Sequence, residues 1–95
     1  MSTLIDDFLD AMWLERGLSD NTTSSYRHDL NHLALWCDET GHALLTLRRV
    51  DLQDYLSARQ SAGYKATSSA RLLSAVRRFY QYLCREKLRE DDPSA

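Results

Sequence analysis

Residues 65–89 have the sequence KATSSARLLSAVRRFYQYLCREKLR, which combines a helical apolar pattern with most of the chain's positive charge. Apolar residues recur here every three or four positions, the spacing that places them on one face of an α-helix. They are Leu72, Leu73, Val76, Phe79, Tyr80 and Leu83. We therefore expect a helix over about residues 66–86 that packs this face into a core.

The opposite face of this helix carries hydroxyl, amide and guanidinium groups. Its members are Thr67, Arg71, Ser74, Arg78, Gln81 and Arg85, with Arg77 on the flank. Such groups bind phosphates and base edges, and a helix fits the width of the DNA major groove. A merely solvated polar face is the more common explanation of such a pattern. Acidic partners at i±4 are almost absent here, however, which favours a ligand-binding face.

The positive charge is confined to this one segment. Residues 65–89 contain seven basic residues and one acidic residue, a local net charge of +6, whereas the whole chain has a net charge of −2. An acidic chain does not coat nucleic acid non-specifically. A focused site is compatible with this balance, because screening limits surface interactions to about 8–10 Å at physiological salt.

The composition predicts one small all-α domain. A chain of 95 residues forms a single domain with a modest core, and its three glycines and one proline leave few positions for β-turns. No apolar run approaches the roughly 18–20 residues of a membrane span, and no export signal is visible, so we expect a cytoplasmic protein. Cys37 and Cys84 fall within helical patterns and are expected to be reduced, buried thiols.

Three further helices are expected before the basic one. They cover about residues 3–16, 20–40 and 52–61, with Ser19 capping the second and Asp51 capping the third. A leucine-rich connector at 42–49 is expected to cover one end of the core. The second helix has a polar outer face without an acid over its first half, formed by Asn21, Ser24, Ser25, His28, Asn31 and His32.

The sequence contains no evident catalytic, cofactor or metal site. Nucleophile–base sets, phosphate-binding glycine loops and paired carboxylates are not apparent. His28 and His32 have the i, i+4 spacing of zinc ligands but lack a third ligand, so surface or DNA-facing histidines are favoured. The tyrosines fall mostly on apolar stripes, where core packing is the simplest explanation.

Two longer stretches resemble a known family. They are FLDAMWLERGLSDNTTSSYRHDL at 8–30 and GYKATSSARLLSAVRRFYQYLCREKLREDDPSA at 63–95. Both resemble the N-terminal core-binding, SAM-like domain of tyrosine site-specific recombinases, and the resemblance spans essentially the whole chain. It implies a four-helix, phage-integrase-type bundle over residues 1–90. Residues 91–95 would begin a linker to a C-terminal catalytic domain, and we expect this tail to have no structure of its own.

The resemblance also implies a set of DNA-contacting residues, because in this family the second and fourth helices face the major groove. From the second helix these are Asn21, Thr22, Ser25, Arg27 and His28. From the fourth helix and its start they are Lys65, Thr67, Ser68, Arg71, Ser74, Arg77 and Arg78.

The implied function is binding of double-stranded DNA at a dif-type recombination half-site for the resolution of chromosome dimers. The implied partner is a second, related recombinase in a heterotetramer on the DNA. The family's catalytic residues belong to the C-terminal domain, so these residues are expected to carry no catalytic site, enzyme activity or cofactor.

An alternative function is a helical protein-interaction module. Its basis is the outward direction of Leu14 and Leu35 on the expected helices, together with the acidic character of residues 1–64. Binding through phosphates weakens steeply with added salt, whereas binding to an apolar partner is far less sensitive. Both functions are compatible, because members of the family assemble on DNA as tetramers.

Overall fold

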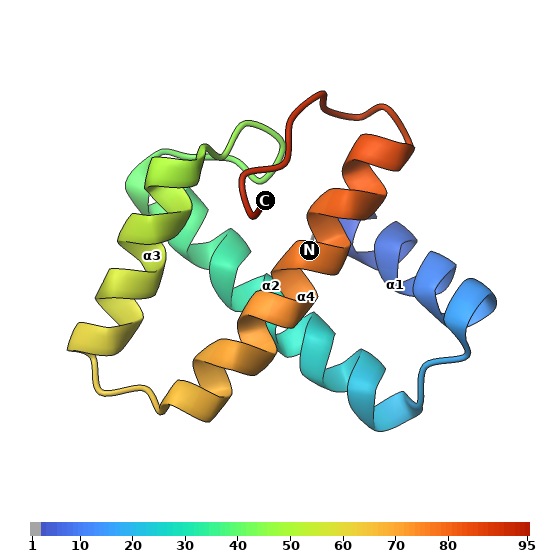
Figure 1. The fold of residues 1–95 in the computed structure, drawn as a ribbon, viewed down its shortest axis with the longest axis horizontal. Coiled ribbons are helices and arrows are strands. Elements are labelled where there is room, and N and C mark those ends of the chain that lie inside the picture. Colours follow the sequence, from blue (N-terminus) through green and yellow to red (C-terminus); the bar gives the residue numbers. More distant parts are fainter. Residues whose placement is uncertain (1–2) are drawn as a thin grey trace.

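The computed structural model describes residues 3–95 and contains four α-helices joined by short connections (Figure 1). The helices are α1 (Thr3–Arg16), α2 (Asp20–Thr40), α3 (Arg49–Ser61) and α4 (Ala66–Arg85). No strand occurs within residues 3–95, so the all-α, four-helix expectation is confirmed. None of these helices is long and apolar enough to cross a membrane.

The core forms where α4 crosses α2 and both helices contact α1 (Figure 1). Its centre is the predicted apolar face of α4, in which Val76, Phe79, Tyr80 and Leu83 have no exposed surface. The Phe79 ring meets the Phe8 ring of α1 edge to face, with 5.4 Å between the ring centroids. Each such buried side chain stabilises the fold by about 1.5–3 kcal/mol, so this stripe sets the position of α4.

The first turn of α2 is fixed by the predicted cap. Ser19 has an extended backbone, and its Oγ accepts a hydrogen bond from the Thr22 backbone N–H at 3.2 Å. At the other end Gly41 adopts a φ of 77° and its N–H donates to the Cys37 carbonyl. A positive φ is open to glycine at little cost, which explains why α2 ends where the sequence predicts. Cys37 is a buried free thiol, whereas Cys84 is only half-buried.

The start of α3 differs from the prediction. The helix begins at Arg49 with Arg48 as its N-cap residue, and Asp51 lies inside the first turn. The Asp51 carboxylate accepts the Arg48 backbone N–H at 3.0 Å and the Arg48 Nε at 3.2 Å. The prediction of Asp51 as the N-cap is therefore wrong, because this carboxylate caps the helix from its third position.

The connector between α2 and α3 closes one end of the core, as expected. Leu44 and Leu47 are buried, whereas Leu45 is exposed. The buried Tyr80 hydroxyl donates a hydrogen bond to the Leu44 carbonyl at 2.9 Å, which ties the connector to α4.

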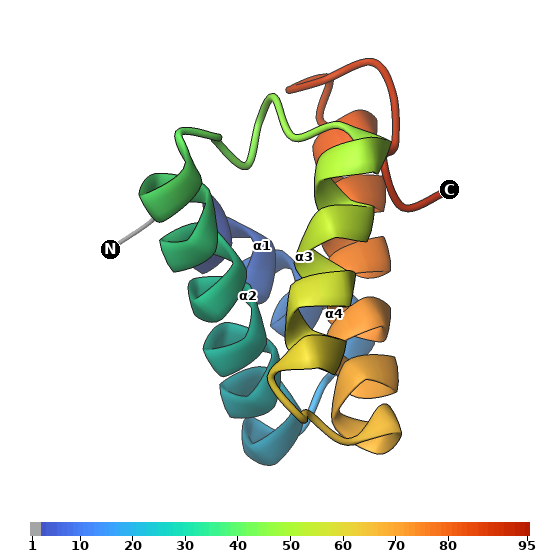
Figure 2. The same ribbon diagram turned by 90° about the vertical axis from the view of Figure 1, so that its left-hand side faces the viewer.

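The tail after α4 contains no regular secondary structure, but it packs on the same end of the molecule (Figure 2). The Arg89 Nη2 donates to the Leu47 carbonyl at 2.8 Å, and the Arg89 guanidinium lies 5.0 Å from the Tyr80 ring centroid. Pro93 is buried. Residues 91–95 thus have no regular secondary structure, as expected, although the burial of Pro93 shows that they lie against the domain.

The capping carboxylate of α3 makes the stability of the fold depend on pH. The Arg48 guanidinium, helped by the Arg48 backbone N–H, holds the pKa of Asp51 below its ordinary value of 3.8. A carboxylate with a lowered pKa in the folded state stabilises the fold above its ordinary pKa, and this contribution is lost as the pH falls through the lowered value. We expect Asp51→Asn to reduce the free energy of unfolding at neutral pH, and the difference from wild type to shrink towards acid.

Urea unfolding along a pH series from neutral to strongly acidic conditions measures this difference. The control is Asp54→Asn, which removes an exposed carboxylate from the same helix. A destabilisation by Asp51→Asn that is equally large at both ends of the series would show that the Asp51 charge is not its cause.

Candidate nucleic-acid interface

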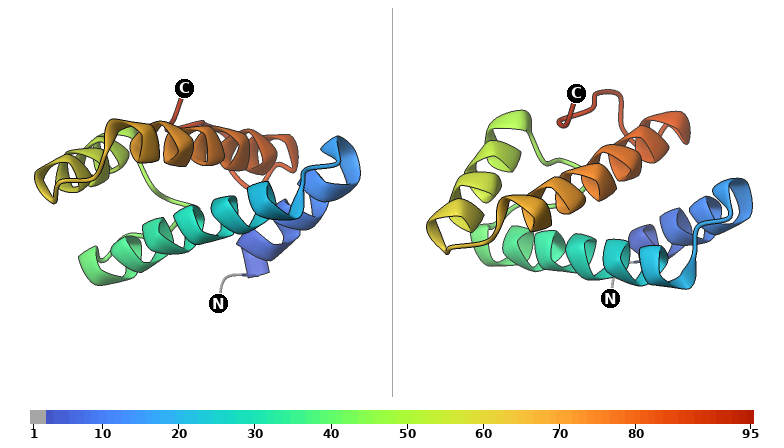
Figure 3. Two further views of the ribbon diagram at one scale, coloured as in Figure 1. Left: turned by 90° about the horizontal axis from the view of Figure 1, so that it is seen from below. Right: turned by 60° about the horizontal axis from the view of Figure 1, so that its bottom comes forward.

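The first halves of α2 and α4 border one hollow on the face seen in the left panel of Figure 3. Its volume is about 360 Å³. It is lined by Asn21, Thr22, Ser25, Tyr26, Arg71 and Ser74. All of these except Tyr26 were predicted from the sequence as DNA contacts, so two segments about fifty residues apart in the chain converge as expected.

Arg71 and Asp29 form the central contact of this hollow. The Arg71 Nε and Nη2 donate to the two oxygens of the Asp29 carboxylate, each at 2.9 Å. The Asp29 side chain is only 3% exposed, whereas the Arg71 side chain is 48% exposed. These hydrogen bonds to the Asp29 carboxylate raise the pKa of Arg71. Arg71 is thus a fixed guanidinium whose charge is balanced by a buried carboxylate.

This pairing adds a partner that the sequence analysis did not consider. The outer face of α2 was predicted to carry no acid over its first half, and acidic partners at i±4 of the basic face of α4 were predicted to be almost absent. Both predictions considered one helix at a time. Asp29 lies just behind the outer face of α2 and reaches Arg71 across the helix crossing, 42 residues further along the chain.

Two other arginines also have partners on neighbouring helices. Arg27 forms an ion pair with Asp6 of α1, and Arg85 forms a bidentate pair with Glu15 of α1, with an Nη2–Oε2 distance of 2.8 Å. These pairs hold α1 against α2 and α4. The structure therefore places Arg27 beside α1 and outside the lining of the hollow.

The remaining cations of α4 are without ion-pair partners among residues 3–95. Lys65 and Arg77 are exposed, and the half-buried Arg78 guanidinium lies 6.0 Å from the Tyr26 ring centroid. Arg78 also lines a second hollow of about 180 Å³ together with Arg16. The net positive charge of this face therefore comes from Lys65, Arg77, Arg78 and Arg16.

Two of these neighbours were missed by sequence reasoning. Tyr26 was assigned to the core, where it is buried, yet part of its surface lines the hollow. Arg16 ends α1 and was not singled out. Its place in the last turn before the capped start of α2 is the signal that could have identified it, because α1 and α2 are joined by a connection of three residues.

The other predicted residues lie on exposed or half-exposed positions nearby. His28 is exposed on α2, and its ring lies next to that of His32, with 4.3 Å between the centroids and an angle of 45° between the ring planes. Within residues 3–95 no group of three potential metal ligands occurs. Thr67 is exposed and Ser68 is half-buried in the first turn of α4, directly after Lys65.

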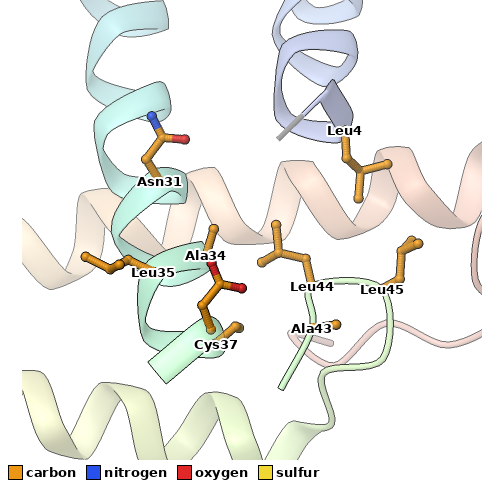
Figure 4. A pocket seen from close by; sticks show the side chains of 9 residues that line it. Leu4, Asn31, Ala34, Leu35, Cys37, Ala43, Leu44 and Leu45 are labelled. Carbon is orange, nitrogen blue, oxygen red and sulfur yellow. The ribbon is translucent and has the colours of Figure 1, made fainter. Parts of the chain in front are cut away.

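A different surface carries an apolar hollow of about 520 Å³ (Figure 4). Its lining comes from α1, the second half of α2 and the connector between α2 and α3. Leu35 and Leu45 are exposed at its edge, and Leu4 and Leu44 also line it. This hollow contains no basic side chain. Its chemistry therefore differs from that of the α2–α4 face, by which we mean the surface around the hollow lined by Asn21 and Arg71.

The chain belongs to the family described as phage integrase, N-terminal SAM-like domain, which it matches over residues 5–87. It is 60% identical over 92 residues to the tyrosine recombinase XerD of Yersinia pestis, covering 97% of this chain and 31% of that relative. The corresponding identity is 58% for the tyrosine recombinase XerD of Haemophilus influenzae, with the same coverage. For the tyrosine recombinase XerD of Vibrio cholerae it is 51%, over 97% of this chain and 30% of the relative.

The chain thus spans about a third of the length of these curated relatives. The resemblance stated from the sequence is confirmed, both in the family and in the four-helix fold.

The Asp29–Arg71 pair leads to a stability prediction. Removing Arg71 leaves a buried carboxylate without its partner, so we expect Arg71→Met to lower the free energy of unfolding by about 2–3 kcal/mol. Asp29→Asn should cost less, and the double variant should lose less than the sum of the two single variants. Urea unfolding of the four proteins gives the coupling free energy directly.

Arg77→Met is the matched control, because it removes an exposed, unpaired arginine from the same helix. We expect it to change stability by no more than about 0.5 kcal/mol. An Arg71→Met variant as stable as Arg77→Met would mean that the Asp29 carboxylate does not need this partner.

Proposed function

We propose that this chain is the DNA-binding N-terminal domain of a tyrosine recombinase, and that the first halves of α2 and α4 contact the duplex. The observation that carries the proposal is the hollow at which predicted residues from both helices meet. The Arg78 guanidinium, which has no ion-pair partner within residues 3–95, lies beside the Tyr26 ring of its lining. Membership in the integrase N-terminal family supports DNA as the ligand.

The charges of the side chains suggest which of them contact phosphates and which contact bases. Lys65, Arg77 and Arg78 are unpaired and supply attraction for phosphates, which positions the duplex without reading its sequence. Asn21 and Ser74 are uncharged hydrogen-bonding groups of the kind that read base edges. Arg71 contributes orientation more than attraction, because Asp29 cancels its charge and holds its guanidinium in one plane.

The finer assignments rest on the resemblance to XerD. We propose that the DNA is a dif-type half-site, that the partner is a XerC-like recombinase in a heterotetramer, and that the process is resolution of chromosome dimers before cell division. A chromosomal substrate implies a cytoplasmic location. In this proposal residues 91–95 lead towards the catalytic domain, and residues 1–90 alone cleave no DNA.

A second function is favoured by the apolar surfaces. Leu14 is 76% exposed at the end of α1, and Leu35 is 57% exposed at the edge of the apolar hollow in Figure 4. We propose these leucines as contacts between recombinase protomers. Association through them should respond little to added salt, whereas duplex binding should weaken steeply.

Duplex binding by variants of α4 tests the first function. Fluorescence anisotropy of a labelled dif-type half-site and of a scrambled duplex, each measured over a salt series, gives affinity and salt slope. We expect Arg78→Ala to weaken both duplexes alike and to reduce the salt slope by about 1. Arg71→Ala should weaken the half-site selectively, by about 1–3 kcal/mol if this guanidinium reads a guanine.

Two further variants keep this test decisive. Arg49→Ala removes an exposed arginine at the start of α3, outside the hollow, and should bind as wild type does. Asn21→Ala repeats the test of base reading without touching the Asp29–Arg71 pair. Unchanged affinity of Arg78→Ala and Arg71→Ala for the half-site would refute the proposed function.

A further inference from the structure

Arg59 is a buried arginine without a balancing carboxylate. The residue is 6% exposed, and its Nε has no hydrogen-bond partner. Within residues 3–95 no acidic side chain forms an ion pair with it, whereas Arg71, Arg85 and Arg48 each have such a partner. Buried charges are normally paired, because desolvation of a lone charge costs several kcal/mol.

Aromatic rings hold the Arg59 side chain in place. Its guanidinium carbon lies 4.2 Å from the centroid of the Tyr64 ring and 5.9 Å from that of the Tyr55 ring. Stacking on rings restrains the guanidinium plane and compensates part of the lost hydration. It does not supply an acceptor for the Nε–H, so the guanidinium is oriented but incompletely satisfied.

Arg59 lines a hollow of about 250 Å³ between α2 and α3. Trp36 and Tyr55 form its wall, with 5.2 Å between their ring centroids, and His32 lies at its α2 side. Burial raises the pKa of the Tyr55 hydroxyl, and the nearby Arg59 guanidinium opposes this shift. Tyr55 therefore stays a neutral hydrogen-bond donor near physiological pH. The hollow combines a cation and a hydroxyl donor with a largely apolar wall.

The position of this hollow connects it to the α2–α4 face. Tyr64 directly precedes Lys65, the N-cap residue of α4, and the His32 ring contacts the ring of His28 one turn earlier on α2. In the left panel of Figure 3 the turn between α3 and α4 and the first half of α4 border the same face of the molecule. The hollow therefore lies between the second half of α2 and the end of α3, next to the start of α4 and to the surface that we assign to the duplex.

We propose that the Arg59 hollow binds a backbone phosphate of the duplex and is an anion-binding site next to the α2–α4 face. The guanidinium fork suits two oxygens of a phosphate, and Tyr55 and His32 add donors. Glu39 is the one acid in the lining and opposes an anion. This inference rests on the proposed function, because it assigns a further contact to the same duplex.

A phosphate of the duplex accounts for the site better than a carboxylate of a protein partner. The neighbouring side chains Lys65 and His28 belong to the face assigned to DNA, and the backbone of a duplex carries a continuous row of phosphates. A protein carboxylate and free inorganic phosphate share the same chemistry, so the experiment separates all three.

The test compares Arg59→Met with Arg49→Met in the duplex titration over a salt series. Both variants remove one arginine from α3, but Arg49 is exposed at the opposite end of the helix. We expect Arg59→Met to weaken half-site binding about tenfold and to lower the salt slope by about 1, and Arg49→Met to change neither. Glu39→Gln should strengthen binding about twofold, because it removes an opposing charge.

The outcomes separate the possible ligands. Equal affinity of Arg59→Met and Arg49→Met overturns the proposal. A second outcome also overturns it. If inorganic phosphate at constant ionic strength shifts the Arg59 Nε–H resonance, while Arg59→Met leaves duplex affinity unchanged, the ligand is free phosphate. Loss of binding to a second recombinase protomer by Arg59→Met, with DNA binding intact, identifies a protein carboxylate and likewise overturns it.

Two safeguards keep this test independent of folding and of the proposed function. If Arg59→Met fails to fold by circular dichroism, Arg59→Lys and Glu39→Gln take its place, and unchanged affinity in both overturns the proposal. Arg59→Lys keeps the charge but loses the fork, so an intermediate loss is expected. If duplex affinity depends on Arg78 but not on Arg59, the phosphate-binding site alone is refuted. If duplex affinity depends on neither Arg71 nor Arg78, the proposed function is refuted.

Discussion

The Asp29 carboxylate is enclosed where α2 and α4 cross, and the Arg71 guanidinium supplies both of its hydrogen bonds from the other helix. Removing a carboxylate from water costs several kcal/mol, and the attraction to a half-exposed arginine returns about 4 kcal/mol at an effective dielectric constant near 20. The pair therefore adds little net stability. Its two-point geometry instead selects the rotation of α4 at which Ser74 and Arg71 share a hollow with Asn21.

Pairing of this kind also determines where the positive charge of the molecule acts. Most acidic side chains near a basic one are used in pairs that join helices or cap them. These pairs are Asp6–Arg27, Glu15–Arg85, Asp29–Arg71 and Asp51–Arg48. Among the cations without an ion-pair partner within residues 3–95, Lys65 precedes α4 and Arg77 and Arg78 lie in its middle, whereas Arg49 and Arg59 lie on α3. A net charge of −2 is thus compatible with a local positive field, because that field depends on the unpaired charges.

Sequence patterns predicted the parts of this structure that depend on neighbours along the chain. Apolar periodicity located α1, α2 and α4, and Ser19 marked the start of α2 because caps act within one turn. Contacts between distant segments escaped this reasoning. Asp29 contacts Arg71 only because α2 and α4 cross in the folded chain, and Arg89 contacts the Leu47 carbonyl only because the tail packs on the connector. The start of α3 was misplaced because an acid can cap a helix either from the N-cap position or from the third helical position.

The two ends of α3 show how burial of charge separates structure from ligand binding. Besides Leu52 and Tyr55, the buried residues of this helix are Asp51 and Arg59. Asp51 is satisfied within the chain by Arg48, so its burial contributes to the fold alone. Arg59 stacks on the Tyr64 ring but has no acceptor for its Nε, so contacts within the fold offset only part of the free energy lost when Arg59 is desolvated. An anion bound there would be stabilised by a charge already dehydrated and oriented, and by linkage it would stabilise this end of α3 in turn.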